Sequence, residues 1–380
     1  MRIALFPSAY RPSIGGVEEL SRQLALAYVR KGHQVTVYTN RWPRSLPAHE
    51  VLDGVDVYRL PFRLPHASWR GRVSYPITNR LVSWTLHRLL KQQRADMIHV
   101  ECVSSNTFYA LRASDELSLP LVVTAQGELT MDPQRAFESG GTLPSLLRHA
   151  ASSADGFTAC SGKTLDDVET FVGHKIDGAK VIFNGTDVPT FTTARPLDLG
   201  SYVFAIGRLV PQKGFDVLLQ AWSKIEHHGH HLVIAGSGPS EDDLRRLVDE
   251  LGVTDSVRFF GPADRDTVPR LFAGATAVAI PSRVDEGLPL VSIETMAAGK
   301  PFVATISGGI REAVTDGVEG LLIEREDPEA LADGLRRLLE GPELRARLAA
   351  AGAARARAFD WSLLADEYLS YFHDTARRRT

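Results

Sequence analysis

The opening stretch MRIALFPSAYRPSIGGVEELSRQLALAYVRKGHQVTVYTN, residues 1–40, decides the fold class. Residues 3–6 are a short apolar run, which predicts a buried strand. From Gly15 onward, apolar residues recur at helical spacing as far as Gly32, and a glycine is the usual residue just past a helix end. Residues 34–39 alternate and are rich in β-branched types, which predicts the next strand. A strand, a helix and a strand joined by short links imply a parallel sheet.

The same alternation continues along the chain in two series. The first series predicts further buried strands at residues 97–100, 121–124, 156–159 and 180–183. The second series predicts strands at residues 202–206, 232–235, 257–260, 277–280, 301–304 and 320–323. Between them, a polar segment bracketed by Pro189 and Pro196 predicts an extended linker. We therefore expect two α/β domains of similar size.

The composition excludes several classes of protein. The chain has 380 residues, of which 44% are hydrophobic and 23% charged, which is typical of a globular enzyme. Its formal net charge of −3 argues against nucleic acid as the main partner, since no overall positive field attracts phosphates. No run approaches the ~18 apolar residues of a membrane helix, and the first ten residues do not resemble a secretory signal. Cys102 and Cys160 form no disulfide framework or metal motif, so we expect reduced thiols and a cytoplasmic protein.

Two glycine-containing turns are candidate ligand loops, because open parallel sheets bind ligands at the carboxyl ends of their strands. Gly15 and Gly16 open the first helix, where glycine lets a ligand approach the backbone and the helix end attracts anions. They do not complete a GxGxxG pattern, which disfavours a nicotinamide-dependent dehydrogenase. Gly236 and Gly238 occupy the turn after strand 232–235. Either loop is also compatible with a plain turn.

Arg208 and Lys213 lie five residues apart on the loop that follows strand 202–206. A strand-to-helix loop of this kind can direct both cations at one diphosphate. Each charge-assisted hydrogen bond would contribute roughly 1.5–3 kcal/mol. The alternative interpretation is a solvated basic loop.

The stretch EGLPLVSIE, residues 286–294, sets two carboxylates eight positions apart. Pro289 suits the first position of a helix, so Glu286 would lie just before that helix and Glu294 in its second turn. The free NH groups of the first turn carry about half a positive charge and can hold a phosphate. The two carboxylates could then accept hydroxyl protons on either side, which matches the order of ribose, diphosphate and sugar in a nucleotide sugar. Two solvated charges are the alternative.

These motifs, together with VIFNGTD at residues 181–187, resemble the retaining glycosyltransferases of the GT-B fold in family 4, over nearly the whole chain. The resemblance implies two Rossmann-like, doubly wound α/β domains facing across a cleft, with a C-terminal helix that returns to the N-terminal domain. We expect an acceptor-binding domain at residues 1–190 and a nucleotide-sugar-binding domain at residues 197–358. The returning helix is expected at residues 359–380.

The resemblance also implies a role for each matching residue. Arg208 and Lys213 would bind the diphosphate and stabilise the leaving group, and Glu286 would contact sugar hydroxyls near the reacting carbon. Glu294 would hold the ribose hydroxyls. Further donor contacts are expected from Gly15, Gly16, Gly236, Gly238, Phe260, Gly261, Gly287, Leu288, Pro289, Leu290 and Val291.

The chain departs from its family after strand 121–124, where similar enzymes often carry a histidine. Gln126 stands in that loop and cannot exchange a proton at neutral pH, although it can hydrogen-bond a sugar hydroxyl. Glu128, His99 and Asn184 are further candidates for contact with the acceptor or the sugar. For Glu128 and His99, a purely structural role is the alternative.

The sequence has no DxD pair at a strand end, so the positive charge opposite the leaving group is expected from Arg208, Lys213 and the helix end. We therefore predict a retaining glycosyltransferase that needs no metal or other cofactor. It would move a sugar from a nucleotide diphosphate sugar, with UDP favoured, to a hydroxyl of a glycan, lipid-linked or small-molecule acceptor. A non-catalytic nucleotide-sugar-binding protein of the same fold and a sugar phosphorylase are the alternatives.

Residues 57–95 contain eight arginines or lysines and no acid, with Trp69, Tyr75 and Trp84 interleaved. One interpretation is a peripheral contact with the anionic cytoplasmic face of a membrane. The other is a solvated amphipathic helix whose aromatic side chains belong to the core.

Overall fold

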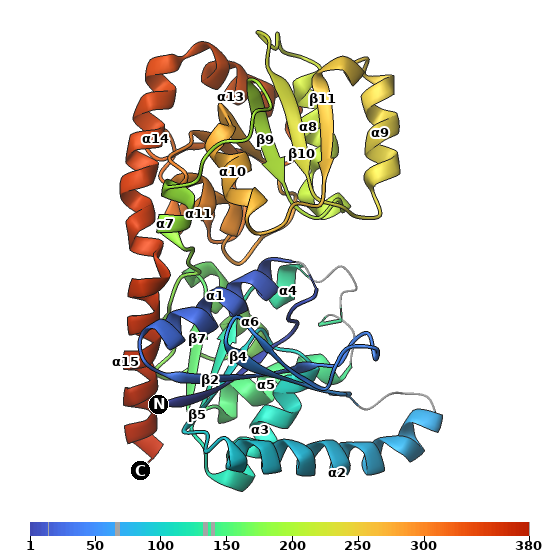
Figure 1. The fold of residues 1–380 in the computed structure, drawn as a ribbon, viewed down its shortest axis with the longest axis vertical. Helices are drawn as coiled ribbons and strands as arrows, with labels where there is room; N and C mark the ends of the chain where they lie inside the picture. The colour runs from blue at the N-terminus through green and yellow to red at the C-terminus, as the bar shows by residue number, and fades with distance from the viewer. Residues whose placement is uncertain (14, 65–68, 132–135, 138–140, 380) are drawn as a thin grey trace. The chain divides into compact units, whose positions relative to one another are not determined.

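The computed structural model describes residues 1–13, 15–64, 69–131, 136–137 and 141–379. The chain divides into an N-terminal unit, residues 1–184 with 361–380, and a C-terminal unit, residues 185–360. Each unit contains one largely parallel sheet with helices packed against it, so the predicted pair of doubly wound α/β units is confirmed (Figure 1). No helix in the described part of the chain has the length and apolar character needed to cross a membrane.

The sheet of the N-terminal unit has eight strands in the order β3-β4-β2-β1-β5-β6-β7-β8. All neighbours pair in parallel except β3 and β4, which are antiparallel. The strands are β1 (Arg2–Pro7), β2 (Gln34–Asn40), β3 (His49–Leu52), β4 (Val55–Leu60), β5 (Met97–Glu101), β6 (Leu121–Ala125), β7 (Gly156–Ala159) and β8 (Lys180–Val181).

The hairpin of β3 and β4 is a correction to the sequence interpretation. Residues 57–60 belong to the basic stretch for which an amphipathic helix was one of two interpretations, but they form the last four residues of β4. Asp53 and Gly54 make the turn with positive φ values of 51° and 81°, and Val55 and Val57 then point into the core. The strand pairs with β2 from Asp56 to Leu60, so sheet contacts decide its conformation.

The helices of the N-terminal unit are α1 (Gly16–Arg30), α2 (Trp69–Gln92), α3 (Ser105–Leu117), α4 (Glu128–Met131), α5 (Thr142–Ser153), α6 (Gly162–Val172) and α15 (Trp361–Arg379). Helix α15, drawn in red, runs beside α1 in Figure 1 and belongs to this unit, as the resemblance implied. The hydroxyl of its Tyr371 accepts from the Phe157 amide at 3.0 Å and donates to the Gly178 carbonyl at 2.9 Å. These bonds attach the C-terminal helix to the edge of the sheet.

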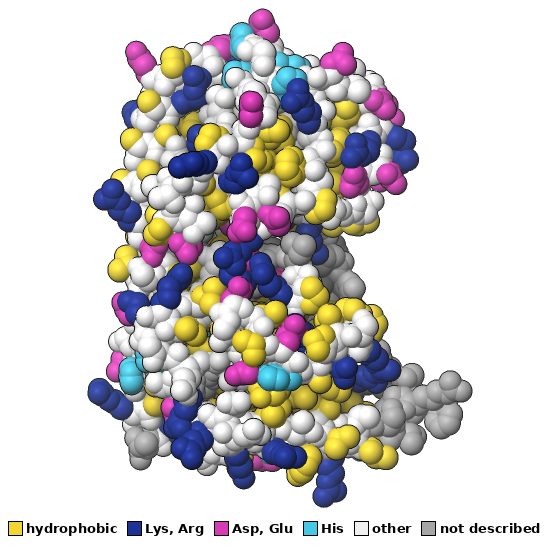
Figure 2. Space-filling view, in the orientation of Figure 1, with side chains coloured by type: hydrophobic (Ala, Val, Ile, Leu, Met, Phe, Trp, Pro, Cys, Tyr) yellow, Lys and Arg dark blue, Asp and Glu magenta, His cyan; other side chains and the backbone are white. Residues whose placement is uncertain are grey.

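The sheet of the C-terminal unit has six parallel strands in the order β11-β10-β9-β12-β13-β14. The strands are β9 (Tyr202–Ile206), β10 (His231–Ala235), β11 (Val257–Gly261), β12 (Ala277–Ile280), β13 (Phe302–Thr305) and β14 (Leu321–Ile323). The helices are α7 (Val188–Thr192), α8 (Phe215–Trp222), α9 (Glu241–Glu250), α10 (Thr267–Gly274), α11 (Leu290–Ala297), α12 (Ile310–Ala313), α13 (Pro328–Glu340) and α14 (Pro342–Ala356). On the face of this unit drawn in Figure 2, acidic and basic side chains are interspersed.

The segment expected as an extended linker is partly helical. Helix α7 begins at Val188 because the Asp187 carboxylate accepts from the Thr190 amide at 3.3 Å and Pro189 tolerates the first turn. The chain passes between the units just before this helix, at residues 184–185, and again at residues 360–361. The domain boundaries expected from the sequence, at residues 190 and 358, lie within a few residues of these two crossing points.

The strand order of the C-terminal unit determines which loops are neighbours. Strand β9 lies between β10 and β12, so the loops that leave these three strands emerge side by side at one edge of the sheet. The order also reverses between β9 and β12, and open α/β sheets bind ligands at such a switch point. Arg208 and Lys213 follow β9, and Glu286 follows β12.

Candidate functional site

Glycines allow the loops at the carboxyl edge of the C-terminal sheet to pack backbone against backbone. Gly214 has φ +65°, and a Cβ there would lie 2.0 Å from the Pro281 carbonyl oxygen. Gly308, with φ +49°, would place a Cβ 1.5 Å from the carbonyl oxygen of Glu286. Any larger residue would separate these loops, so both positions require glycine. The packing brings the loops after β9, β12 and β13 together around Glu286.

Lys213 and Glu286 form an ion pair at this edge. The Lys213 ammonium Nζ donates to Glu286 Oε1 at 2.8 Å, and the Ser282 hydroxyl donates to the same oxygen. Burial raises the pKa of Glu286, but the charge and hydrogen bond of Lys213, the Ser282 bond and the charge of Arg208 together lower it. Glu286 is therefore a buried carboxylate that keeps its negative charge. All hydrogen bonds between the Glu286 carboxylate and described residues go to Oε1.

Arg208 provides a second positive charge at the same edge. Its side chain is exposed, and its charge contributes to the lowered pKa of Glu286. Within the described ranges, the Arg208 guanidinium makes no hydrogen bond or ion pair. The structure thus brings the three predicted catalytic residues together and leaves the guanidinium available to an anion.

Helix α11 starts beside Glu286. Pro289 precedes its first residue, one position earlier than expected, and Leu290 and Val291 begin the helix. Amides of a first helical turn have no carbonyl partner within the helix, so those of Leu290 and Val291 are donors at this edge. Gly287 and Leu288 form the buried loop between Glu286 and the helix, and Glu294 is half-buried in its second turn. The expected order of carboxylate, amides and carboxylate is therefore present.

The glycine turn after β10 packs against neighbouring loops. The Gly236 amide donates to the Gly261 carbonyl at 2.8 Å, so this amide is not free to donate to a nucleotide sugar. A Cβ on Gly236 would lie 1.9 Å from the Gly207 carbonyl oxygen, and one on Gly238 would lie 2.4 Å from that of Leu209. These glycines therefore permit close packing of the loops, and the predicted contact of this turn with the donor stays a prediction.

Phe260 is the last residue but one of β11, whereas Asn184 lies three residues beyond the end of β8. Phe260 is 38% exposed near the carboxyl end of β11, where its ring is accessible for stacking against a planar ligand group. Asn184 is buried, and its side-chain oxygen has no hydrogen-bond partner in the described part of the protein. It is the last residue of the first N-terminal segment.

In the N-terminal unit, Gly15 and Gly16 lie at the start of α1, as predicted. The same first turn already carries the carboxylates of Glu18 and Glu19. The Ser13 hydroxyl donates to Glu18 at 2.9 Å, and this carboxylate lies against Gly15. Two negative charges at a helix N-terminus weaken its attraction for a phosphate.

His99 is enclosed by protein side chains, which favours the structural alternative over the predicted contact with the acceptor or the sugar. The ring is completely buried in the N-terminal unit and packs against Tyr368 and Phe372 of α15. Its Nε2 lies 2.8 Å from the Thr124 hydroxyl. Burial lowers the pKa of His99 to about 3, so the ring is neutral. The structural alternative describes this residue.

Glu128 also has a structural role. Its Oε1 accepts from the Val103 amide at 2.5 Å and its Oε2 from the Gln126 amide at 2.8 Å. The carboxylate thereby connects the loops that follow β5 and β6, while burial raises its pKa. Gln126 itself lies in the second of these loops with 6% of its surface exposed.

Comparisons with known proteins agree with this architecture. Residues 14–190 match the model described as Glycosyltransferase Family 4, and residues 198–355 match that of the glycosyl transferases group 1. A D-inositol 3-phosphate glycosyltransferase of Frankia alni is 32% identical, over 94% of this chain and 93% of that protein. An uncharacterized glycosyltransferase of Methanocaldococcus jannaschii is 30% identical, over 89% of both chains. The chain belongs to the family 4 glycosyltransferases.

Solved structures support the fold of this glycosyltransferase. Sucrose-phosphate synthase from Thermosynechococcus elongatus is similar with a TM-score of 0.77 and 21% identity, over 98% of both chains. HepE from Anabaena, solved in complex with UDP and glucose, is similar with a TM-score of 0.77 and 22% identity, over 98% of this chain and 100% of that one. The expected GT-B fold and glycosyltransferase activity are thus confirmed.

Sequence reasoning missed several polar residues of the glycosyltransferase that hold its loops. Asp285 accepts from the Gly308 amide at 2.9 Å and pairs with Arg325 at 3.1 Å. Ser282 bonds Glu286, and Glu101 bonds Gln126. Ser282 and Glu101 are polar residues at or just beyond the carboxyl end of a buried strand, and that position is the signal that could have identified them.

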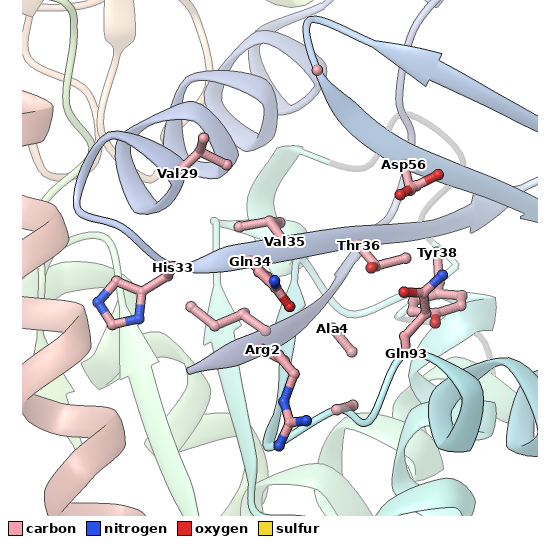
Figure 3. Close-up of a pocket in the computed structure, with 13 residues that line it drawn as sticks. Arg2, Ala4, Val29, His33, Gln34, Val35, Thr36, Tyr38, Asp56 and Gln93 are labelled. Carbon is pink, nitrogen blue, oxygen red and sulfur yellow. The ribbon is translucent and has the colours of Figure 1, made fainter.

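A cavity of about 330 Å³ lies elsewhere in the N-terminal unit of the glycosyltransferase (Figure 3). Arg2 and Gln34, which begin β1 and β2, contribute to its wall together with Tyr38, Asp56 and Gln93. The cavity is therefore near the amino ends of these strands, at the sheet edge opposite to the predicted ligand loops. None of the predicted site residues lines it.

Proposed function

We propose that this glycosyltransferase transfers a sugar from a UDP-sugar to an acceptor hydroxyl, with retention of anomeric configuration and without a metal ion. The observation that carries the proposal is the Lys213–Glu286 pair, 2.8 Å apart, beside the exposed Arg208 and the first turn of α11. Two cations and free amides suit a diphosphate, and the carboxylates suit hydroxyl groups. The UDP and UDP-glucose complexes of HepE, which has the same fold, support the choice of UDP.

In the proposed donor complex, the C-terminal unit holds the nucleotide sugar. Arg208, Lys213 and the amides of Leu290 and Val291 bind the diphosphate. Glu294 accepts from the ribose hydroxyls. Glu286 uses Oε1 to hold Lys213, and its other oxygen accepts from a sugar hydroxyl near the reacting carbon.

The proposed catalysis depends on charge that is in position before the reaction. As the bond from the anomeric carbon to the diphosphate oxygen breaks, negative charge accumulates on the leaving group. Lys213 and Arg208 stabilise that charge, and fixed donors of this kind contribute roughly 2.7–4 kcal/mol each in studied enzymes. The acceptor oxygen then attacks from the same face, its proton passes to a diphosphate oxygen, and the configuration is retained.

A panel of UDP-sugars and acceptors tests this reaction, with UDP release and the product anomer followed by NMR. We expect one UDP-sugar to give a product with the anomeric configuration of the donor, at a rate that EDTA leaves unchanged. An inverted product would refute retention, and loss of activity in EDTA that Mg²⁺ restores would refute metal independence. Dependence of the reaction on inorganic phosphate as a substrate would instead indicate a phosphorylase.

We further propose that helix α2 makes a peripheral contact with an anionic membrane surface and brings the N-terminal unit to a lipid-linked acceptor. Ile77, Leu81 and Trp84 are 74%, 62% and 60% exposed and lie on one face of the helix. Arg80, Arg88 and Lys91 are exposed on the same side, and no acid interrupts the helix. Trp84 is thus not a core residue, whereas Tyr75 is half-buried and the side chain of Trp69 lies outside the described residues.

Vesicle co-sedimentation tests the membrane proposal. The protein should sediment with phosphatidylglycerol vesicles and remain in solution with phosphatidylcholine vesicles, because both charge and apolar area contribute. The double substitution Leu81→Ser and Trp84→Ser should reduce the bound fraction at least about five-fold. Leu363→Ser, which removes a 52% exposed leucine from α15, should leave it unchanged. Equal sedimentation with both lipids, or no effect of the double substitution, would contradict the proposal.

A further inference from the structure

The side-chain amide of Gln126 has a fixed orientation in the N-terminal unit. Its nitrogen Nε2 donates to Glu101 Oε2 at 2.8 Å, and its backbone amide is held by Glu128 at 2.8 Å. Its carbonyl oxygen Oε1 accepts from no described residue, yet it is not among the atoms sealed from solvent. The carbonyl oxygen of this side chain is therefore available to a ligand.

Glu101 has a carboxyl group whose one regular side-chain hydrogen bond to a described residue goes to Gln126. It is the last residue of β5 and is completely buried. Its Oε1 lies 3.2 Å from Nε2 of the neutral His99 and makes no hydrogen bond of regular geometry. Burial, opposed by the Gln126 bond and assisted by the charge of Glu128, raises the pKa of Glu101 to about 8. Burying an ionisable group costs free energy of folding, so a carboxyl group kept here to bind Gln126 indicates a role for that bond.

We propose that Glu101 is a positioning residue that orients the Gln126 carboxamide so that its carbonyl oxygen accepts a hydrogen bond from a substrate hydroxyl. An amide without this partner can rotate and present its NH₂ group instead, and a substrate hydroxyl would then have to accept a hydrogen bond rather than donate one. Because Glu101 Oε2 accepts a hydrogen bond, Nε2 must face inward and Oε1 outward. The inference rests on the proposed function, in which Gln126 contacts the donor or acceptor sugar.

The orientation has a consequence for specificity. A site with a fixed acceptor oxygen favours a ligand that offers a hydroxyl and disfavours one that offers a carboxylate or no group at all. Glu101 would therefore select for a neutral hydroxylated sugar at this position, although it does not touch the sugar. Where similar enzymes often have a histidine, this chain has a carboxamide, which does not itself exchange a proton at neutral pH.

Steady-state kinetics with the preferred UDP-sugar and acceptor test the proposal. Gln126→Ala and Glu101→Ala should each lower kcat/KM about ten-fold, and the double variant should lose no more than either single one. Glu101→Gln keeps an acceptor oxygen for Nε2 and should restore most of the activity. Glu169→Ala removes another buried carboxylate of the same unit and should have no such effect. Independent losses that multiply in the double variant would overturn the proposal.

A second measurement does not depend on activity. In ¹⁵N NMR spectra, the side-chain NH₂ of Gln126, assigned by its absence in Gln126→Ala, should exchange slowly with water because Nε2 is bonded and buried. Glu101→Ala should raise that exchange rate at least about ten-fold, whereas Glu169→Ala should not. Unchanged exchange in Glu101→Ala would refute the positioning role. If Gln126→Ala kept full activity while the exchange result held, the sugar contact itself would be wrong.

Discussion

Replacing Lys213 by alanine is expected to lower kcat/KM by about 100-fold or more, since a preorganised donor opposite the leaving group is lost. The loss has a second cause. Lys213 is the ion-pair partner of Glu286, and burial alone would raise the pKa of that carboxyl once the ammonium is removed. The residual activity of Lys213→Ala should therefore rise with pH as Glu286 ionises, whereas the intact enzyme should show no such rise. Initial rates of UDP release over a pH series measure both effects.

A matched control is available within the same unit. Lys224 pairs with Glu329 at 2.7 Å on the exposed surface, so Lys224→Ala removes one charge and one ion pair away from the site. Surface pairs contribute little, and this variant should keep full activity. If Lys213→Ala behaved like Lys224→Ala, the assignment of the leaving-group site would fail.

Stability separates the two roles of Lys213. An unpaired buried carboxylate destabilises a protein by about 3–5 kcal/mol, so Lys213→Ala should also melt at a lower temperature. Adding Glu286→Gln removes the buried charge and should recover part of that loss. Activity should not recover, because neither the cation nor the carboxylate has returned. Recovery of both together would mean that Lys213 acts only on stability.

Strands could be predicted from the sequence where both faces are buried, because such strands are continuous runs of apolar residues. Residues 202–206 and 277–280 are continuous apolar runs, and both became central strands with the expected bounds. Strand β3 was missed because it is an edge strand with alternating exposure, and its residues HEVL look like loop. Strand β4 lies between β3 and β2, and its residues 57–60 stood in the basic stretch for which an amphipathic helix was one interpretation. Local pattern therefore indicates strands covered on both faces and is weak at the edge of a sheet.

The residues of the candidate site were proposed from the sequence, but their contacts with one another could not be. Arg208 and Lys213 were chosen from the loop after β9 and Glu286 from the loop after β12, and the strand order that makes β9 and β12 neighbours explains why they meet. The 2.8 Å bond between Lys213 and Glu286 joins residues 73 positions apart, and no spacing rule gives it. The burial of His99 had the same limit, because it depends on a helix that begins at residue 361.

The last prediction concerns the glycine that supports Glu286 from the neighbouring loop. Gly308→Ala would place a Cβ 1.5 Å from the Glu286 carbonyl oxygen, in a backbone conformation with φ +49°. The loop of residues 285–287 would have to move, although Gly309 donates to the Glu286 and Gly287 carbonyls at 3.2 and 3.1 Å. We expect kcat/KM to fall about 100-fold, because a shift of about 1 Å in a catalytic group can have that effect.

Gly317→Ala is the control that isolates the steric part of this effect. Gly317 has a similar φ of +73°, but no atom lies within 4 Å of the added Cβ. It should therefore incur only the backbone penalty of roughly 1–2 kcal/mol, a few degrees in Tm, with activity retained. Gly308→Ala should incur that penalty and the cost of displacing the loop. Thermal melting and initial rates measured on both variants decide the matter: equal Tm and equal activity would mean that the loop after β13 does not hold Glu286 in place.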